Sequence, residues 1–295
     1  MLMPRLAPSR ATISRMSTAP SPFQPIALYD SGVGGLSVLR AARTALPHEH
    51  LLYFGDQANV PYGSRSLEEL RAIAEASTRF LLSQGAKLIV IACNTASAAA
   101  LKHLRAVFPE VPFVGMEPAV KPAAEQSLSR KVGVLATPST FHGELYASVV
   151  ERFAQDVEIF QSTCPGLVSQ IEKARLNTAK TRRILEEAVL PMLAAGADTL
   201  VMGCTHYPFV IPLIEEIAAG RARVIDPAPA VARQTARVLA ERGLLNPGPG
   251  QGSLRFITSG KPAVFEDTLA SLLGMRANAE GARWQDGELS LIPRN

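Results

Sequence analysis

One pattern occurs twice in this chain, as Leu88-Ile-Val-Ile-Ala-Cys93-Asn-Thr and as Thr199-Leu-Val-Met-Gly-Cys204-Thr-His. In both stretches a short apolar run, typical of a fully buried strand, ends in a cysteine that is followed by polar residues. Two other strand-like runs end in Asp30 and Thr137, and nearly the same length of chain separates the members of each pair. Because both pairs have nearly the same spacing along the chain, they favour a duplicated α/β unit whose halves face each other across a cleft. Chance similarity between buried strands is the alternative.

Apolar runs of this kind alternate with longer segments that carry apolar residues at helical spacing, such as 67–82 and 181–193. Short buried strands separated by helices predict an α/β fold with doubly wound parallel sheets. In open sheets of this class, ligands bind beyond the carboxyl ends of the strands. The expected strands are residues 25–30, 51–55, 87–92, 112–115, 131–136, 157–160, 199–203, 223–225 and 254–258.

The composition is that of a globular protein, with 295 residues, 47% hydrophobic, 19% charged and a net charge of +4. We attribute the net positive charge to a solvated surface with basic tails, so nucleic acid is not expected as a partner. Residues 1–24 contain no acidic side chain and are expected to be a disordered basic extension. No apolar run is long enough for a membrane span. The 3 cysteines lack CxxC or metal-ligand spacing, which favours a reducing cytoplasm.

Cys93 and Cys204 are the best candidates for chemistry, although a lone cysteine on a buried strand is more often a small hydrophobic residue. Each precedes residues that begin a helix, and free backbone N–H groups there are expected to favour the thiolate. Inverting a carbon acid requires removal of a proton from one face and delivery to the other, which two opposed acid–base groups can perform. Nucleophilic catalysis would need a histidine base, and His206 is near Cys204 alone. Cys164 is expected to be structural.

Polar turns follow several other expected strands. Asp30-Ser31-Gly-Val-Gly-Gly lacks the Lys-Ser/Thr of a phosphate loop, so a tight turn capped by the aspartate is the simpler interpretation. The loop from Asp56 to Pro61-Tyr62-Gly63-Ser64 is either a plain turn or a set of donors for an anion. Thr137 either binds a carboxylate or caps a helix, and Ser139 is expected to be a cap.

Several segments together resemble the glutamate racemase family. They occur in the family's order and spacing, and the resemblance covers residues 25–275. Cys-Asn-Thr is shared with aspartate racemases and other members of the superfamily, whereas its combination with Cys-Thr-His-Tyr-Pro is much more specific to glutamate. The matching segments are Asp30-Ser-Gly-Val-Gly-Gly, Tyr53-Phe-Gly-Asp56, Val60-Pro-Tyr-Gly-Ser64, Cys93-Asn-Thr-Ala96 and Gly203-Cys-Thr-His-Tyr-Pro208.

The resemblance implies two pseudo-symmetric α/β domains around a central cleft. Residues 26–118 plus 227–275 would form the first domain, 119–226 the second, and 276–295 a C-terminal tail. It also implies a cytoplasmic homodimer that supplies D-glutamate for peptidoglycan, and so for cell shape, with no cofactor and no metal. Activation by a peptidoglycan precursor is left open.

The resemblance also implies roles for individual residues. Cys93 would remove the α-proton of D-glutamate and Cys204 that of L-glutamate. Asp30 would lie beside the first thiol, and His206, partnered by Glu172, would assist the second. The positions that match substrate-binding residues are Asp30, Ser31, Tyr62, Gly63, Asn94, Thr95, Thr137, Thr205 and His206, and Asp56 is a supporting residue. The rival hypotheses are an aspartate racemase, in which His206 would be unexpected, and a non-catalytic amino-acid-binding protein.

Overall fold

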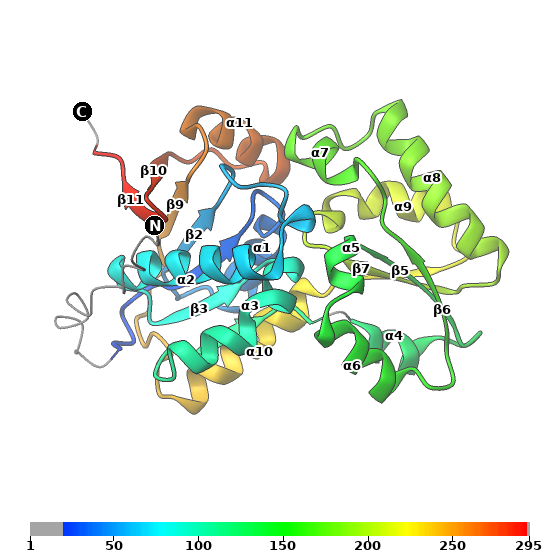
Figure 1. Cartoon of the computed structure of the whole chain (residues 1–295), viewed down its shortest axis with the longest axis horizontal. Coiled ribbons are helices and arrows are strands. Elements are labelled where there is room, and N and C mark those ends of the chain that lie inside the picture. Colours follow the sequence, from blue (N-terminus) through cyan, green and yellow to red (C-terminus); the bar gives the residue numbers. More distant parts are fainter. Residues whose placement is uncertain (1–19, 118, 294–295) are drawn as a thin grey trace, which may run out of the picture.

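The computed structural model describes residues 20–117 and 119–293, which form two β-sheets lying side by side (Figure 1). The larger sheet contains β1 (Ile26–Asp30), β2 (Leu51–Gly55), β3 (Leu88–Ile91), β4 (Phe113–Gly115), β9 (Leu254–Thr258), β10 (Ala279–Gln285) and β11 (Glu288–Leu291). Its strand order is β11-β10-β9-β2-β1-β3-β4. Neighbouring strands run parallel, except that β10 and β11 are antiparallel.

The smaller sheet contains β5 (Lys131–Ala136), β6 (Glu158–Ser162), β7 (Thr199–Gly203) and β8 (Arg223–Ile225). Its order is β6-β5-β7-β8, with all neighbours parallel. The larger sheet contains the same arrangement as β2-β1-β3-β4. Cys93 follows β3 as Cys204 follows β7, and Asp30 ends β1 where Thr137 follows β5. The prediction of two pseudo-symmetric parallel α/β units is therefore confirmed.

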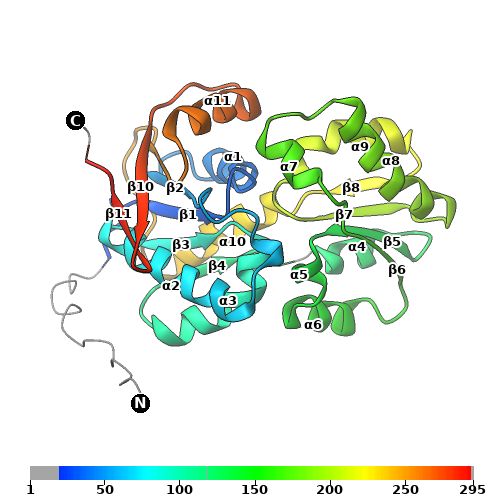
Figure 2. The same ribbon diagram turned by 45° about the horizontal axis from the view of Figure 1, so that its top comes forward.

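Helices cover both faces of each sheet, as Figure 2 shows. They are α1 (Leu36–Ala45), α2 (Leu67–Ser83), α3 (Asn94–Val107), α4 (Val120–Gln126), α5 (Pro138–Phe141), α6 (Glu144–Phe153), α7 (Leu167–Glu172), α8 (Ala179–Ala194), α9 (Ile211–Ala218), α10 (Ala228–Glu241) and α11 (Pro262–Leu273), with short 3₁₀ helices at Tyr62–Ser64 and Tyr207–Val210. On the larger sheet, α1, α10 and α11 share one apolar cluster, and α2 and α3 share another on the opposite face. None of the helices in the described part of the chain has the length and apolarity needed to cross a membrane.

The strand sequences explain this layering. Strands β1, β2, β3 and β7 are buried along their whole length, and strands covered on both faces read as continuous apolar runs. Along β1, Ile26 and Leu28 pack into one apolar cluster, whereas Ala27 and Tyr29 pack into the cluster on the other face. The first cluster also includes Leu135 of β5, so the two halves share part of their apolar core.

The C-terminal segment differs from expectation. Each strand predicted from the sequence forms, with ends shifted by up to about two residues, which is the usual error of such boundaries. The prediction of a tail over 276–295 is wrong, because β10 pairs with β9 and β11 pairs with β10. The hairpin turns at Asp286 and Gly287, whose φ angles are 51° and 80°. An Asp-Gly pair suits a two-residue hairpin turn because both residues tolerate positive φ, so this pair is the sequence signal for the hairpin.

The chain leaves the larger sheet after β4, forms the whole smaller sheet, and returns through α10 to add β9, β10 and β11. Most of the predicted N-terminal extension, residues 1–19, lies outside the described residues. From residue 20 onward, the carbonyl of Pro22 accepts a hydrogen bond from Lys87 Nζ. Lys87 also forms a buried ion pair with Glu49, with 2.5 Å between Nζ and Oε2. These contacts fix the start of the described chain against the base of the larger sheet.

Candidate active site

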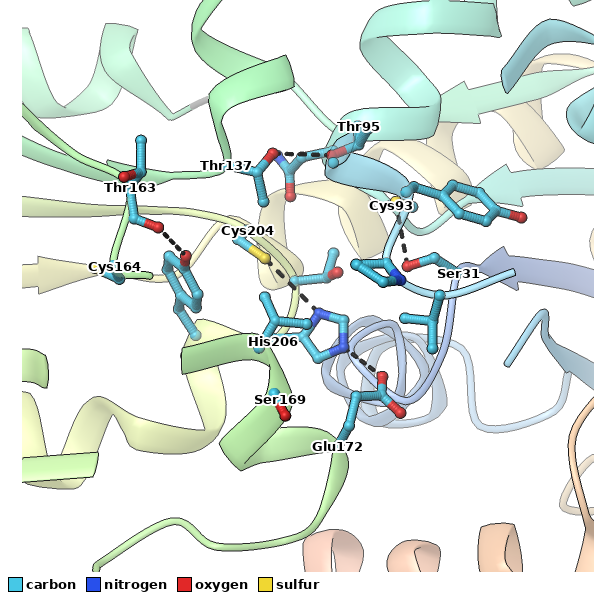
Figure 3. A pocket seen from close by; sticks show the side chains of 18 of the residues that line it. Ser31, Cys93, Thr95, Thr137, Thr163, Cys164, Ser169, Glu172, Cys204 and His206 are labelled. Atoms are coloured by element: carbon cyan, nitrogen blue, oxygen red, sulfur yellow. Dashed lines mark hydrogen bonds and ion pairs between the residues drawn. The ribbon is translucent and has the colours of Figure 1, made fainter. Parts of the chain in front are cut away.

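Cys93 and Cys204 line one cavity of about 550 Å³ between the two halves of the molecule (Figure 3). The cavity lies beyond the carboxyl ends of the parallel strands, where this fold class binds ligands. Asp30 and Asp56 are fully buried and are absent from its wall. The predicted site residues that do line it are Ser31, Tyr62, Gly63, Cys93, Asn94, Thr95, Thr137, Glu172, Cys204, Thr205 and His206.

Cys93 is the N-cap of α3, and its sulfur accepts a hydrogen bond from the Ala96 N–H at 3.5 Å. The Ser31 hydroxyl oxygen lies 3.9 Å from the same sulfur. Burial raises the pKa of the Cys93 thiol, the charge of Asp30 raises it further, and the Ala96 N–H lowers it only in part. The expectation that the helix end favours the thiolate is therefore wrong for Cys93, because desolvation of the charge outweighs one backbone donor.

Cys204 has different surroundings. Its sulfur lies 3.7 Å from His206 Nδ1, and His206 Nε2 lies 2.6 Å from Glu172 Oε1. Burial acts to lower the pKa of His206, but its hydrogen bonds to Cys204 and Glu172 raise that pKa well above its usual value. Burial acts to raise the pKa of Glu172, but the hydrogen bond and charge of His206 lower it. The Cys204 thiol therefore lies next to the His206 imidazole, whose raised pKa favours the protonated form of the histidine.

The glycine-rich turn after β1 allows this histidine pair to approach the larger sheet closely. A Cβ atom on Gly34 would lie 2.5 Å from His206 Nδ1, and one on Gly32 would collide with the Glu172 carboxylate. Between the two glycines, the Val33 N–H donates to Glu172 Oε1 at 2.9 Å. The turn lacks side chains where the other half of the protein must fit against it, so close packing is what its glycines provide.

Asp30 connects the two halves behind the cavity wall. Its Oδ1 accepts the Gly32 N–H at 2.8 Å, and its Oδ2 accepts the Thr205 hydroxyl at 3.2 Å. Burial raises the pKa of Asp30, while the charge of His206 and the Gly32 N–H oppose that shift. Asp30 thus orients Thr205 by a hydrogen bond and acts on Cys93 through its charge.

Asn94 is a buried polar side chain that lacks a partner. It is 3% exposed and lines the cavity, and neither Oδ1 nor Nδ2 of its amide is hydrogen-bonded within the described structure. A buried polar group left unpaired costs about 1–3 kcal/mol, so such groups are usually satisfied. The amide offers one acceptor for an ammonium group and donors for a carboxylate. Asn94 therefore marks this cavity as a site for a polar ligand.

Hydroxyl groups of Thr137 and Ser139 also connect the two halves at the cavity. Thr137 Oγ1 lies 3.0 Å from Thr95 Oγ1 in the other half and 3.0 Å from Thr140 Oγ1. Ser139 Oγ donates to the Gly63 carbonyl at 2.6 Å. The prediction that Ser139 caps a helix is therefore wrong, since its hydroxyl serves a contact between the halves.

Tyr62 lines the cavity, but its hydroxyl is already used. It donates to Asp56 Oδ2 at 2.7 Å and lies 2.6 Å from the Tyr29 hydroxyl. Asp56 Oδ1 accepts a second set of donors, Ser259 Oγ at 2.6 Å and Trp284 Nε1 at 2.7 Å. Asp56 is thus a buried anchor for the loop that carries Tyr62.

Two further residues belong to the site although the sequence did not single them out for it. Gln57 Nε2 donates to Glu172 Oε2 at 3.3 Å, and Gln57 Oε1 accepts the Thr258 hydroxyl at 2.9 Å. A hydrogen-bonded chain therefore runs from the end of β9 to His206. Cys164, predicted to be structural, lines the cavity with a positive φ of 44°, and burial raises the pKa of its thiol to about 12.

The fold and the site together define a class of protein. Two thiols that line one cavity from different halves of the protein can remove a proton from one face of a carbon acid and return one to the other face. That arrangement, in paired α/β halves, is suited to a racemase. Among residues 20–117 and 119–293, no cluster of three or more His, Cys, Asp or Glu side chains is placed to hold a metal ion.

Comparisons with known proteins agree with this class. Residues 36–235 match the family model described as Asp/Glu/Hydantoin racemase. A glutamate racemase of Roseiflexus sp. is 51% identical over 250 residues, covering 84% of this chain and 92% of the relative. The Francisella tularensis glutamate racemase solved with D-glutamate matches with a TM-score of 0.77 and 28% identity, over 88% of this chain and 97% of that one. The Escherichia coli glutamate racemase, solved with L-glutamate and the activator UDP-MurNAc-Ala, matches with a TM-score of 0.73 and 31% identity, over 85% of this chain and 94% of that one. This chain belongs to the Asp/Glu/hydantoin racemase family and, within it, to the glutamate racemases.

Proposed function

We propose that this chain interconverts L- and D-glutamate without a cofactor, with Cys204 and Cys93 as the bases for the two enantiomers. The observation that carries the proposal is that two buried thiols, at matching strand ends in opposite halves, line the same cavity. The family relationship supports glutamate as the substrate, because two structural neighbours were solved with its D and L forms. The test is to incubate the purified protein with either enantiomer, with no cofactor added, and to follow optical rotation.

The two directions use the same groups with exchanged roles. Starting from L-glutamate, the Cys204 thiolate takes the α-proton and the Cys93 thiol delivers its own proton to the opposite face. The raised pKa of Cys93 keeps it protonated for this step, and the protonated His206 is a counter-charge for the Cys204 thiolate. Turnover leaves Cys204 as the thiol and Cys93 as the thiolate. In that form the enzyme can take the α-proton of D-glutamate through Cys93 and return one through Cys204.

Substrate length is the basis of the first prediction. The unpaired Asn94 amide and the Ser31 hydroxyl line a cavity built from both halves, so donors are available there for the carboxylates of glutamate. Aspartate is one methylene shorter and would leave donors at one end without a partner. An unpaired buried polar group costs about 1–3 kcal/mol, so kcat/KM for aspartate should be about 10- to 100-fold below that for glutamate.

The measurement is kcat/KM for both enantiomers of the two amino acids on one enzyme preparation. Equal or faster turnover of aspartate would favour the alternative, an aspartate racemase. Binding of glutamate without any turnover would favour the non-catalytic amino-acid-binding protein.

The second prediction concerns pH and Glu172→Gln. Glu172 helps to raise the pKa of His206, so removing its charge should lower that pKa and let His206 lose its proton at lower pH. In the D-to-L direction the Cys204–His206 pair delivers the proton. The alkaline limb of that profile should therefore move down by about one to two pH units, the shift expected for loss of a charged hydrogen bond.

The equilibrium constant of a racemisation is 1 at every pH, so kcat/KM from L-glutamate and from D-glutamate must follow the same pH profile. The alkaline limb of kcat/KM in Glu172→Gln should therefore move by the same amount in both directions, since protonated His206 is also the counter-charge of the Cys204 thiolate. An alkaline limb that stays at the wild-type position in Glu172→Gln would contradict the role of Glu172 in holding the proton on His206.

The cellular role extends the same proposal. D-glutamate made by this chain would supply peptidoglycan synthesis and so contribute to cell shape, and the enzyme would act in the cytoplasm as a homodimer. The structural neighbour from Escherichia coli was solved with the activator UDP-MurNAc-Ala. Activation of this chain by such a precursor is a hypothesis that the same assay can test.

A further inference from the structure

The C-terminal hairpin extends past the strand on which it packs. In β10, Ala279, Glu280 and Gly281 pair with β9, and the last of these pairs is Gly281 with Thr258, where β9 ends. From Ala282 onward, β10 pairs only with β11. The hairpin thus continues beyond the carboxyl edge of the sheet, on the side where the parallel strands open to the cavity.

This extension places Trp284 against the loop that follows β2. Gly55, the end of β2, pairs with Thr258, so Asp56 and Ser259 leave the sheet side by side. Trp284 Nε1 donates to Asp56 Oδ1 at 2.7 Å. Ser259 Oγ donates to the same oxygen at 2.6 Å.

The second oxygen of Asp56 holds the cavity wall. Asp56 Oδ2 accepts the Tyr62 hydroxyl at 2.7 Å and Asn59 Nδ2 at 2.9 Å. Asp56 itself is fully buried, so its carboxylate depends on these donors for the stabilisation that water would otherwise provide. Residues 60–64, which follow within the same loop, line the cavity. One carboxylate therefore joins the C-terminal hairpin to the wall of the substrate cavity.

We propose that Trp284 is a positioning residue for glutamate binding, acting through Asp56 and Tyr62 on the cavity wall. The inference rests on the proposed function, since glutamate is the ligand whose binding it affects. Without the indole N–H, a buried carboxylate loses one of its donors, and the remaining donors must rearrange around it. The donor that belongs to the cavity wall is Tyr62, so the loop it anchors would shift.

The test compares Trp284→Phe, which keeps an aromatic ring and removes the N–H, with Arg283→Ala as the matched control. Arg283 is the preceding residue of the same strand and is exposed, with its side chain on the opposite face. A wall that contacts substrate in the ground state and the transition state alike affects KM rather than kcat. We expect Trp284→Phe to raise KM for D- and L-glutamate about 3- to 10-fold with kcat within about twofold, as loss of one hydrogen bond to a charged group allows.

A second variant keeps the test decisive if Trp284→Phe folds poorly. Ser259→Ala removes the other donor to Asp56 Oδ1 and leaves the hairpin intact, so it should raise KM in the same way. Arg283→Ala should leave KM and kcat unchanged. Unchanged KM in both Trp284→Phe and Ser259→Ala, whatever their melting temperatures, would overturn the proposal and leave the hairpin as packing alone.

Fluorescence gives a readout that does not depend on turnover. Trp284 is the single tryptophan of the chain, so its emission reports this contact without interference. Titration with D-glutamate should change the emission of the wild type and leave that of Tyr62→Phe unchanged, because that substitution removes the hydroxyl bound to Asp56. If the enzyme racemises D-glutamate but its Trp284 emission does not change at saturating D-glutamate, the proposed link between Trp284 and the cavity wall is wrong. A wild type that does not racemise glutamate would instead count against the proposed function.

Discussion

Replacing either Cys93 or Cys204 with alanine should abolish net racemisation in both directions. Each direction needs a base on one face of the α-carbon and an acid on the other, and the two thiols exchange these roles when the direction reverses. Loss of one thiol therefore removes the base in one direction and the acid in the other. We expect kcat to fall by at least about 1000-fold for both enantiomers, as loss of a principal acid–base group allows.

Exchange in heavy water distinguishes the two variants, because removing a proton needs only the base on that face. Cys93→Ala should retain slow exchange of the α-proton of L-glutamate through Cys204, and Cys204→Ala that of D-glutamate through Cys93. Mass spectrometry of the recovered amino acid measures both. Cys164→Ser is the matched control, since Cys164 lines the same cavity and has no assigned proton transfer, so it should stay near the wild-type rate. Racemisation at the wild-type rate by either alanine variant would contradict the two-base proposal, and Cys93 and Cys204 would then be buried hydrophobic residues only.

Gly34→Ala should cause the other large loss of activity. The added Cβ would lie 2.5 Å from His206 Nδ1 and 2.7 Å from His206 Cε1. His206 cannot simply turn away, because its ring contacts Cys204 on one side and Glu172 on the other. The methyl group would push the two halves apart at the point where the second thiol is held. A displacement of about 1 Å at a catalytic group can cost about 100-fold, and we expect a loss of at least this size in kcat/KM.

Gly250→Ala is the control for that substitution, because a Cβ atom there would meet nothing within 4 Å. Its kcat/KM and melting temperature should match those of the wild type. If Gly34→Ala kept full activity, the close packing of the turn against His206 would have no functional importance.

The sequence predicts most of the fold because its central strands are buried on both faces. Short continuous apolar runs, such as those that end at Cys93 and Cys204, indicate buried strands when helical segments separate them. The C-terminal hairpin escapes this reasoning because it lies at the sheet edge. In β10, Glu280 and Arg283 interrupt the apolar pattern, and the Asp286-Gly287 turn is a short signal within a polar segment.

The site was predicted less completely, since its partners come together only in the folded chain. Cys93, Asn94 and His206 are found from local motifs at strand ends. The contacts of Gln57 and Trp284 join residues more than a hundred positions apart, and no local pattern reveals them. Desolvation of Cys93 also depends on long-range packing, which is why the helix end alone gives the wrong direction for its pKa.

The path of the chain has a consequence for synthesis on the ribosome. Strand β2 lies inside the larger sheet, between β1 and β9, yet β9 follows the entire smaller sheet in the chain. The nascent protein therefore has β2 available long before its neighbour has been translated. An unpaired apolar strand edge can recruit other chains, so this interval is when aggregation threatens most. The smaller sheet, contiguous in sequence, can fold during that interval, and the arrival of β9 then ends the exposure of β2.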